Sequence, residues 1–381
     1  MSEPLGDSGA RAGRRQPATP IPLTVLTGFL GAGKTTLLNR LLKDPALADT
    51  AVIINEFGDV SLDHLLVEHV GENMVLLQSG CLCCTLRGDL VDGLEKLLRN
   101  LDNHRAKFSR VLLETTGLAD PAPVLQTAMA HPYLVMRYRL DGVVTVVDAV
   151  NGETTLDQHA EAVKQAAMAD RIVLTKTDLA DGLQRERIVA RLHALNPAAT
   201  ILDAAKGEAA PDTLLNCGLY DPARKIPDVK KWLAAEAYAD AHAHGRDHHH
   251  HDVNRHDEHI SSFVLTSDAA IPAGTLEMFL ELLRATHGNK LLRVKGIVKL
   301  VEMPDTPVVV HGVQHVFHPT ARLERWPDDD HRTRLVFITR DLPERVVREL
   351  FEAFVGTPAP DRPDREALTD NPLIPFGGVD R

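Results

Sequence analysis

Residues 28–35 read GFLGAGKT, and their types and spacing are those of a phosphate-binding loop, G-x-x-x-x-G-K-[ST]. Glycines at this spacing let backbone N–H groups close around a polyphosphate, and the N-terminus of a helix directly after the loop adds its positive dipole end. Lys34 would place its charge at the β- and γ-phosphates, and the hydroxyl of Thr35 would ligate Mg²⁺. The residues therefore predict a nucleoside triphosphate site.

An acidic residue at the end of a later apolar run fits the same chemistry. Residues 111–117 read VLLETTG, and P-loop NTPases place a group near Mg²⁺ and the γ-phosphate at the end of such a strand. Glu114 is the candidate for that group, and the backbone N–H of Gly117 is a candidate γ-phosphate contact. By itself the pattern also fits a buried strand ending in a polar turn. Asp148 ends another apolar run, where we favour a structural role over that of a second acid near the metal.

Residues 175–178 read TKTD, which is similar to the [NT]-K-x-D motif that reads guanine in GTPases. The carboxylate of Asp178 would accept two hydrogen bonds from the guanine edge, a pattern that adenine does not donate. Thr175 and Lys176 complete the motif, with threonine where asparagine is commoner, which leaves the strength of guanine selection open. The motif favours GTP and GDP as ligands.

Three cysteines within four residues, Cys81, Cys83 and Cys84, form a C-x-C-C cluster. Three thiolates so close together can bind one soft or borderline ion, such as Zn²⁺, Co²⁺ or Cu⁺, and leave a fourth position for another ligand. Such an incomplete set of ligands suits transfer of a metal better than storage. The alternatives are buried structural thiols or a redox pair. Cys217 stands alone, and we expect it in the core.

Histidines gather in residues 241–259, which contain eight of them among acidic residues and almost no aliphatic ones. This segment is expected to be a solvated loop that binds divalent metals weakly, as a reservoir would; the alternative is a polar linker without a metal role. The accessory ligands would be His242, His244, His248, His249, His250 and His251. The later residues His311, His315 and His318 are expected to be exposed strand residues instead of ligands.

Length and composition limit the class of protein. The 381 residues are enough for two domains with buried cores. The formal net charge of −11 argues against non-specific binding of nucleic acid. No apolar run reaches the roughly 18 residues of a membrane-spanning helix. The first 20 residues lack the apolar core of a signal peptide, so we expect a cytoplasmic protein, either a monomer or a homodimer.

Strands and helices must position these residues, and they alternate from residue 21 to about residue 217, which predicts an open α/β sheet with mostly parallel strands. Ligands bind beyond the carboxyl ends of the strands in such a sheet. The phosphate loop, residues 114–117 and residues 175–178 should therefore converge on one nucleotide. The expected strands span residues 23–27, 51–57, 74–78, 110–116, 142–149, 171–177 and 200–204.

A change of pattern after residue 217 predicts further segments. A second, smaller α+β domain is expected from residue 260 to 355, with a sheet that carries helices on one face. Its alternating basic positions in LLRVKGIVK (291–299) favour an exposed strand face, and a surface for docking a partner is the alternative. The predicted organisation is a flexible leader (1–20), a nucleotide-binding domain (21–217), a linker with the histidine-rich loop (218–259), the second domain (260–355) and a disordered tail (356–381).

With these motifs the chain resembles the CobW-like GTPases of the G3E group, a family of P-loop GTPases and proposed metallochaperones. The resemblance covers residues 21–355, and its C-x-C-C segment looks similar to the zinc-responsive branch of the family. It implies a P-loop NTPase α/β domain followed by a CobW C-terminal α+β domain. The matching segments are GFLGAGKTTLLNRLL (28–42), INEFGDVSLD (54–63), SGCLCCTLRGDL (79–90), ETTGLADP (114–121) and TKTD (175–178).

The resemblance also implies roles for individual residues. The cysteines would hold the transferred metal, and Glu56 would be a further candidate to sense or ligate it. Lys34, Thr35 and Glu114 are the catalytic candidates. The nucleotide-binding candidates are Gly28, Gly31, Ala32, Gly33, Lys34, Thr35, Thr36, Gly117, Thr175, Lys176 and Asp178.

Together these features lead to the hypothesis of a metallochaperone that hydrolyses GTP to GDP and phosphate with Mg²⁺. It would capture a divalent metal, Zn²⁺ in the first place and Co²⁺ in the second, and deliver it to a client protein. Two other classes remain open. A small-molecule kinase would use the same phosphate loop but has no use for three clustered thiols. A metal storage protein would explain the thiols and imidazoles but would gain nothing from Lys34 and Thr35.

Overall fold

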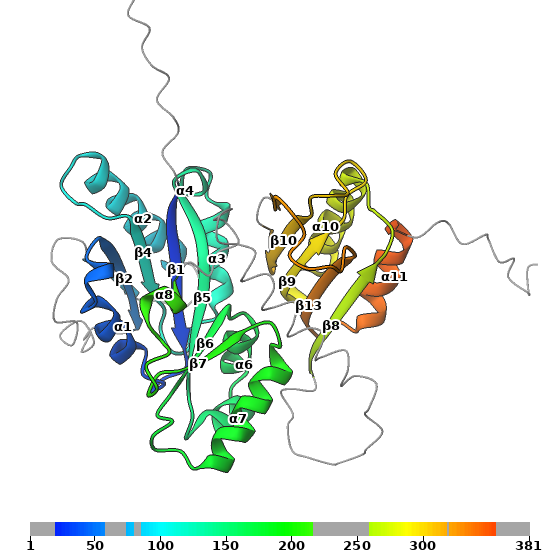
Figure 1. The fold of residues 1–381 in the computed structure, drawn as a ribbon. Helices are drawn as coiled ribbons and strands as arrows, with labels where there is room; N and C mark the ends of the chain where they lie inside the picture. Colours follow the sequence, from blue (N-terminus) through cyan, green and yellow to red (C-terminus); the bar gives the residue numbers. More distant parts are fainter. Residues whose placement is uncertain (1–19, 58–73, 80–84, 216–258, 318–319, 356–381) are drawn as a thin grey trace, which may run out of the picture.

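A computed structural model of the chain describes residues 20–57, 74–79, 85–215, 259–317 and 320–355 (Figure 1). The expected leader up to residue 19, the linker from 218 to 258 and the tail from 356 lie outside the described residues. Among the helices of the described part, none combines the length and the apolar character needed to cross a membrane.

The first sheet has seven strands in the order β3-β2-β4-β1-β5-β6-β7, and every pairing between them is parallel. This confirms the predicted parallel P-loop NTPase sheet. Each of the seven apolar runs picked from the sequence contributes one strand. The strands are β1 (Ile21–Gly28), β2 (Thr50–Phe57), β3 (Met74–Ser79), β4 (Arg110–Glu114), β5 (Tyr138–Asp148), β6 (Arg171–Thr175) and β7 (Thr200–Asp203).

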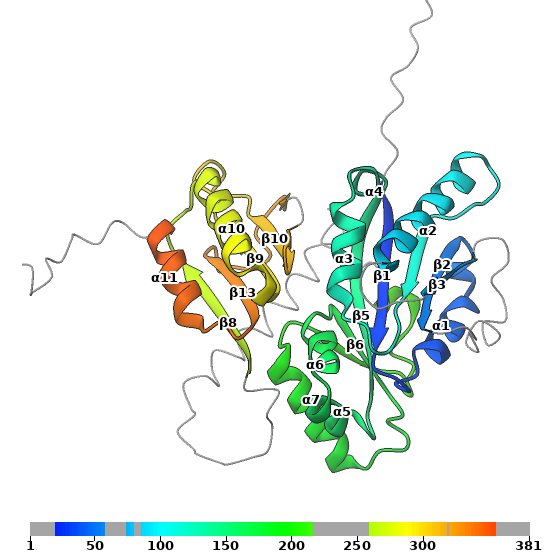
Figure 2. The same ribbon diagram turned by 180° about the vertical axis from the view of Figure 1, so that it is seen from behind.

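Helices cover both faces of this sheet (Figures 1 and 2), as a parallel sheet requires because its crossover connections must pass over a face. Successive residues of β1 point to opposite faces: Leu23 and Val25 pack in one buried cluster, and Leu26 packs in another. The helices are α1 (Lys34–Leu42), η1 (Pro45–Leu47), α2 (Thr85–Asp102), α3 (Pro121–Ala130), α4 (Pro132–Arg137), α5 (Gly152–Gln158), α6 (Ala160–Ala167), α7 (Gly182–Leu195) and α8 (Pro211–Leu214).

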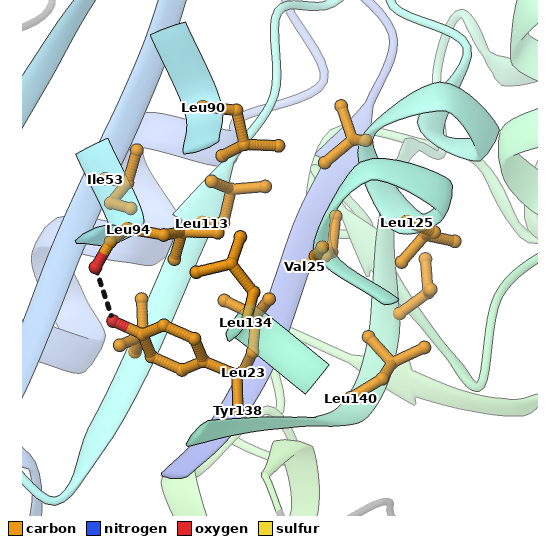
Figure 3. Close-up of a cluster of buried hydrophobic side chains, with 14 of the residues drawn as sticks. Leu23, Val25, Ile53, Leu90, Leu94, Leu113, Leu125, Leu134, Tyr138 and Leu140 are labelled. Carbon is orange, nitrogen blue, oxygen red and sulfur yellow. Dashed lines mark hydrogen bonds between the residues drawn. The ribbon is translucent and has the colours of Figure 1, made fainter. Parts of the chain in front are cut away.

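Leucines of α2 and residues of β1, β4 and β5 form the cluster on the first of these faces (Figure 3). Tyr138 is fully buried at the start of β5, and its hydroxyl donates a 2.9 Å hydrogen bond to the carbonyl oxygen of Leu94. Burial raises the pKa of the Tyr138 hydroxyl. The bond supplies the partner that a phenol needs in an apolar core.

The second sheet is antiparallel, in the order β11-β10-β9-β13-β8, with β12 paired to β10. Helices α10 and α11 pack on one of its faces, where Phe279 meets Phe351 edge to face. This is the α+β arrangement expected from the sequence. The elements are β8 (Ile260–Ser267), α10 (Ala273–His287), η4 (Gly288–Lys290), β9 (Leu291–Val298), β10 (Val308–Val313), β11 (Val316–Phe317), β12 (Ala321–Arg322), β13 (Thr333–Arg340) and α11 (Glu344–Val355).

Residues 308–317 form two strands, β10 and β11, instead of one continuous strand. Gln314 has a φ of 50°, in the left-handed region. The chain therefore turns back there, and β11 pairs antiparallel with β10 as a short hairpin.

The expectation of an exposed basic face on residues 291–299 is wrong, because that face of the second sheet packs on the first domain. Arg293 and Lys295 of β9 are only 2% and 5% exposed. Asp170, directly before β6, accepts hydrogen bonds from the Arg293 guanidinium and, at 2.8 Å, from Lys295 Nζ. Leu292 of β9 also joins the buried cluster of the first domain. A carboxylate from the first domain thus compensates cations from the second.

His311 was also expected to be exposed, and this too is wrong: it is 7% exposed, beside Arg293 in the same buried group. His315 is partly exposed and contacts Asn289. His318 lies outside the described residues.

Candidate functional site

The candidate residues of the first domain gather at the carboxyl edge of its sheet. The phosphate loop follows β1, Glu114 ends β4, Asp148 ends β5 and Thr175 ends β6. The register pairs Leu26 with Glu114, and Asp148 with Thr175. Neighbouring parallel strands therefore deliver all four to one edge, where open α/β sheets bind ligands.

Glycines of the phosphate loop occupy positions that other residues would not tolerate. Gly31 and Gly33 have φ values of 72° and 95°, in the left-handed region that favours glycine. At Gly28 a Cβ atom would lie 2.3 Å from the carbonyl oxygen of Val146 on β5. The loop therefore keeps its backbone close to the sheet and its N–H groups available to a phosphate.

Lys34 and Thr35 begin α1 directly after the loop. Lys34 is buried, and its Nζ donates to the carbonyl oxygen of Phe29 at 3.2 Å, inside the same loop. Thr35 Oγ1 donates to Glu114 Oε1 at 3.3 Å. This hydroxyl and this carboxylate are hard oxygen ligands of the kind that Mg²⁺ prefers, so the pair fits the ion expected from the sequence.

The TKTD segment is tied to the phosphate loop by two side chains. Thr175 Oγ1 donates to the carbonyl oxygen of Ala32 at 2.6 Å, and Lys176 Nζ donates to that of Gly31 at 2.9 Å. Lys176 also has a φ of 57°, a conformation that is costly for a non-glycine residue and is concentrated at functional sites. Asp178 is exposed at the same edge. Threonine at position 175 thus does a structural task, fixing the loop beside the segment expected to read the base.

Asp148 pairs with Lys176 Nζ at 2.7 Å. Burial opposes its ionisation, but hydrogen bonds from Lys176, Asn151 and the backbone N–H of Val150 outweigh that effect and hold its pKa below the ordinary value. An ionised Asp148 fixes the lysine of the TKTD segment. This agrees with the structural role favoured from the sequence.

Gly117 lies against the phosphate loop from the other side. A Cβ atom at this position would meet the backbone nitrogen of Leu30 at 2.6 Å. The segment that follows β4 is joined to β1, since the N–H of Thr115 donates to the carbonyl oxygen of Leu26 at 2.9 Å. Only a glycine allows this approach of the two loops.

Comparison with known proteins agrees with this geometry. Residues 22–203 match the CobW/HypB/UreG nucleotide-binding domain, and residues 260–355 match the cobalamin synthesis protein CobW C-terminal domain. The chain belongs to the CobW/HypB/UreG family.

Its similarity to individual members of the family extends over both domains. The zinc chaperone YjiA of Escherichia coli (strain K12) is 35% identical over 333 residues, which cover 87% of this chain and 98% of YjiA. The zinc chaperone CobW of a Sinorhizobium species is 32% identical, with coverage of 88% and 97%. The crystal structure of the Zn(II)-bound YjiA GTPase from E. coli covers 88% of this chain and 99% of its own, at 30% identity and a TM-score of 0.60.

The thiolate cluster expected for a CobW-like protein falls outside the described residues, as do the six candidate histidines. No group of three or more histidine, cysteine or acidic side chains that could hold a metal occurs in the described part of the chain. The backbone of β2, which contains Glu56, pairs with β3 up to Phe57 and Ser79. Ser79, the last residue of β3, lies at the carboxyl edge of the sheet, and Cys81 follows it by two residues in the sequence.

Two residues of this CobW/HypB/UreG domain escaped the sequence analysis. Asp203 ends β7 and accepts a 2.6 Å hydrogen bond from Thr177 Oγ1, so it anchors the TKTD segment. Burial works against its ionisation, but bonds from Thr177 and from the backbone of Ala205 and Lys206 keep its pKa lowered. An acid at the end of an expected strand was the available signal. Gln165 of α6 contacts the segment after β4 and gave no signal in the sequence.

Proposed function

We propose that this chain is a GTP-hydrolysing metallochaperone that binds Zn²⁺ through Cys81, Cys83 and Cys84 and passes it to a client protein under control of the bound nucleotide. The observation that supports this proposal most strongly is that the nucleotide-binding candidates and the strand that precedes the cysteines end at the same edge of the first sheet. The phosphate loop, Glu114 and the ends of β2 and β3 all lie at the carboxyl edge of one sheet. A change at the γ-phosphate can therefore reach the segments that lead to the cysteines without crossing the domain.

GTP hydrolysis needs little covalent chemistry from the protein, because positioning and charge neutralisation dominate phosphoryl transfer. Lys34 would leave the Phe29 carbonyl and bind the β- and γ-phosphate oxygens. Thr35 and Glu114 would hold Mg²⁺, which when bound neutralises charge on the phosphates. Relatives that match 87% and 88% of the chain are named zinc chaperones, and the solved relative is named a GTPase.

The metal is the cargo in this scheme, and zinc is favoured over cobalt. Three thiolates suit Zn²⁺, and the fourth position of a tetrahedral site stays open to a ligand from the client. The YjiA relative was crystallised with Zn(II) bound. Client delivery then needs only that metal affinity differ between the GTP-bound and GDP-bound states.

Nucleotide-dependent zinc affinity tests the metallochaperone function directly. With Mg²⁺ present, Zn²⁺ should bind about tenfold more tightly with a non-hydrolysable GTP analogue than with GDP, a typical coupling between two sites. Competition with a chromophoric chelator measures both affinities in the full chain. Replacing Cys81, Cys83 and Cys84 together by serine should abolish the tight site.

Cys217→Ser provides the matched control, since it removes the remaining cysteine of the chain and should leave zinc affinity unchanged. Equal zinc affinity in both nucleotide states would contradict nucleotide-controlled delivery. Tight binding that survives the triple substitution would contradict the thiolate site.

Base selectivity tests the role of Asp178. Asp178→Ala should raise the KM for GTP by about a hundredfold, because two hydrogen bonds to the guanine edge would be lost, and leave the weak hydrolysis of ATP unchanged. Steady-state phosphate release with each nucleotide measures the effect. Glu186→Ala removes an exposed acid from the nearby helix α7 and should change neither the KM for GTP nor the KM for ATP. If Asp178→Ala behaved like this control, Asp178 would not read the base.

A further inference from the structure

Gln165 of α6 holds the segment that follows β4. The side chain is 1% exposed, and its Nε2 donates to the carbonyl oxygens of Gly117 at 3.2 Å and Ala119 at 2.9 Å. Both partners are carbonyls, which only accept hydrogen bonds. The orientation of the amide is therefore determined, with its nitrogen toward the segment.

The neighbouring residue reinforces this attachment. Lys164 Nζ forms a 2.7 Å ion pair with Asp120, which also caps the N-terminus of α3. Two successive side chains of α6 thus hold residues 117–120 at three points. At its other end the segment is fixed to β1, because Thr115 Oγ1 bonds to Thr27 Oγ1 at 2.8 Å.

The helix that carries Gln165 is itself fixed to the sheet beside the phosphate loop. Thr145 Oγ1 of β5 donates to the backbone carbonyl oxygen of Gln165 at 2.7 Å, and both groups are buried. Thr145 pairs in register with Thr27, directly before the loop. The side chain that contacts Gly117 is therefore buried, and its backbone is hydrogen-bonded to the sheet.

The orientation that lets Gln165 Nε2 donate to residues 117 and 119 leaves the oxygen of the same amide, Oε1, without a hydrogen-bond partner among the described residues. Gln165 Oε1 is buried and accepts no hydrogen bond from the described part of the chain. Gln165 is also one of the residues that line a cavity of about 230 Å³, together with Phe29, Leu30 and Asp148 among others, between the phosphate loop, the end of β5 and helices α5 and α6. A buried acceptor left to water or a ligand is unfavourable. An apolar side chain would avoid that cost, but it could not donate to the two carbonyls.

We propose that Gln165 is a positioning residue for GTP hydrolysis: its two hydrogen bonds hold the backbone of residues 117–119 where the N–H of Gly117 meets the γ-phosphate. Gly117 lies against Leu30 of the phosphate loop, so a small shift of this segment changes the space at the γ-phosphate. The β-phosphate would be held by the phosphate loop itself. Gln165 should therefore favour GTP over GDP. A positioning role in GTP hydrolysis requires that the chain hydrolyses GTP, so this role rests on the proposed function.

Two substitutions of nearly equal size remove the donors and test the role. In Gln165→Met and Gln165→Glu, affinity for a non-hydrolysable GTP analogue should fall about tenfold and kcat should fall by about the same factor, whereas GDP affinity should stay within about twofold. Fluorescence titration with labelled nucleotides measures the two affinities, and phosphate release measures kcat and KM. Retained GDP affinity also reports that each variant is folded.

The pH dependence of nucleotide affinity in the Gln165 variants distinguishes a positioning role from a role in packing alone. A glutamate at this buried position has a raised pKa, and its protonated form can donate one hydrogen bond to a carbonyl. Lowering the pH from neutral to mildly acidic should therefore restore part of the GTP-analogue affinity of Gln165→Glu, but not that of Gln165→Met. Gln158→Glu and Gln158→Met, on the exposed end of α5, are the matched controls and should behave like the wild type at both pH values.

The outcomes distinguish this role from the proposed function. If the wild type hydrolyses GTP and Gln165→Met keeps both kcat and the ratio of GTP-analogue to GDP affinity, the positioning role is overturned and the GTPase stands. Equal losses of GTP-analogue and GDP affinity also overturn it, because the effect would then lie in the phosphate loop as a whole. A wild type without GTP hydrolysis overturns the proposed function, and the positioning role with it.

Discussion

Lys34→Ala is expected to lower kcat for GTP hydrolysis by about 10²- to 10³-fold, the loss typical when one preorganised group that stabilises transition-state charge is removed. Lys34 is the basic residue of the phosphate loop, and its buried Nζ already lies within the loop, 3.2 Å from the carbonyl oxygen of Phe29. A short reorientation would bring it to the β- and γ-phosphates. Phosphate release at saturating GTP measures the change.

A matched lysine at the other end of the same helix controls for the loss of charge. Lys43 is exposed and caps the C-terminus of α1, so Lys43→Ala should leave kcat within about twofold of the wild type. The folded state of Lys34→Ala can be checked by its thermal unfolding. Hydrolysis at the wild-type rate by folded Lys34→Ala would show that residues 28–35 do not form the catalytic phosphate site.

The phosphate loop and the first sheet were predictable because their signals are local. The loop motif is contained in eight consecutive residues, so it can be recognised locally. Gly31 and Gly33 adopt left-handed φ values, which explains why the motif requires glycine. Strands β1, β4, β5 and β6 are buried on both faces, so each is a short, nearly continuous apolar run. Such runs can be recognised without knowledge of their partners.

The buried charges between the domains could not be predicted, because their burial depends on residues far away in the sequence. Arg293 and Lys295 alternate with apolar residues, which is also the pattern of a strand with one solvated face. Their partner Asp170 is more than a hundred residues away. The role of Gln165 could not be predicted for the same reason, because it depends on hydrogen bonds to the carbonyls of Gly117 and Ala119, which are distant in the sequence.

Loss of the charge on Asp170 should destabilise the chain by about 3–5 kcal/mol, the range found when one partner of a buried ion pair is removed. Asp170 is 2% exposed and lies between Arg293 and Lys295, so Asp170→Asn would leave two buried cations without their carboxylate. Asparagine keeps the size of the side chain and an acceptor for the N–H of Val143, which isolates the effect of charge. The free energy of unfolding from urea titration measures the loss.

Asp268→Asn provides the matched control, since this carboxylate is 90% exposed, and its substitution should change the free energy of unfolding by less than about 0.5 kcal/mol. Adding Lys295→Met to Asp170→Asn should recover part of the loss, because one uncompensated cation is then replaced by an apolar side chain. A loss in Asp170→Asn no larger than that of Asp268→Asn would mean that the carboxylate does not hold the two domains together.

The loss caused by Asp170→Asn should also shrink as the pH rises and become constant above about pH 8, and Lys295 explains the direction. Burial and the neighbouring charge of Arg293 lower the pKa of Lys295 from 10.5 to about 8 in the folded protein, although Asp170 works in the opposite sense. Without Asp170 that pKa falls further. Between the two values the wild-type fold binds one proton more than the folded variant, whereas the unfolded chains bind the same number. The stability difference therefore decreases with pH in that window, and above it Lys295 is neutral in both proteins. Urea titrations at mildly acidic, neutral and mildly alkaline pH measure this slope, and a loss that grew with pH would place the compensated charge on a group other than Lys295.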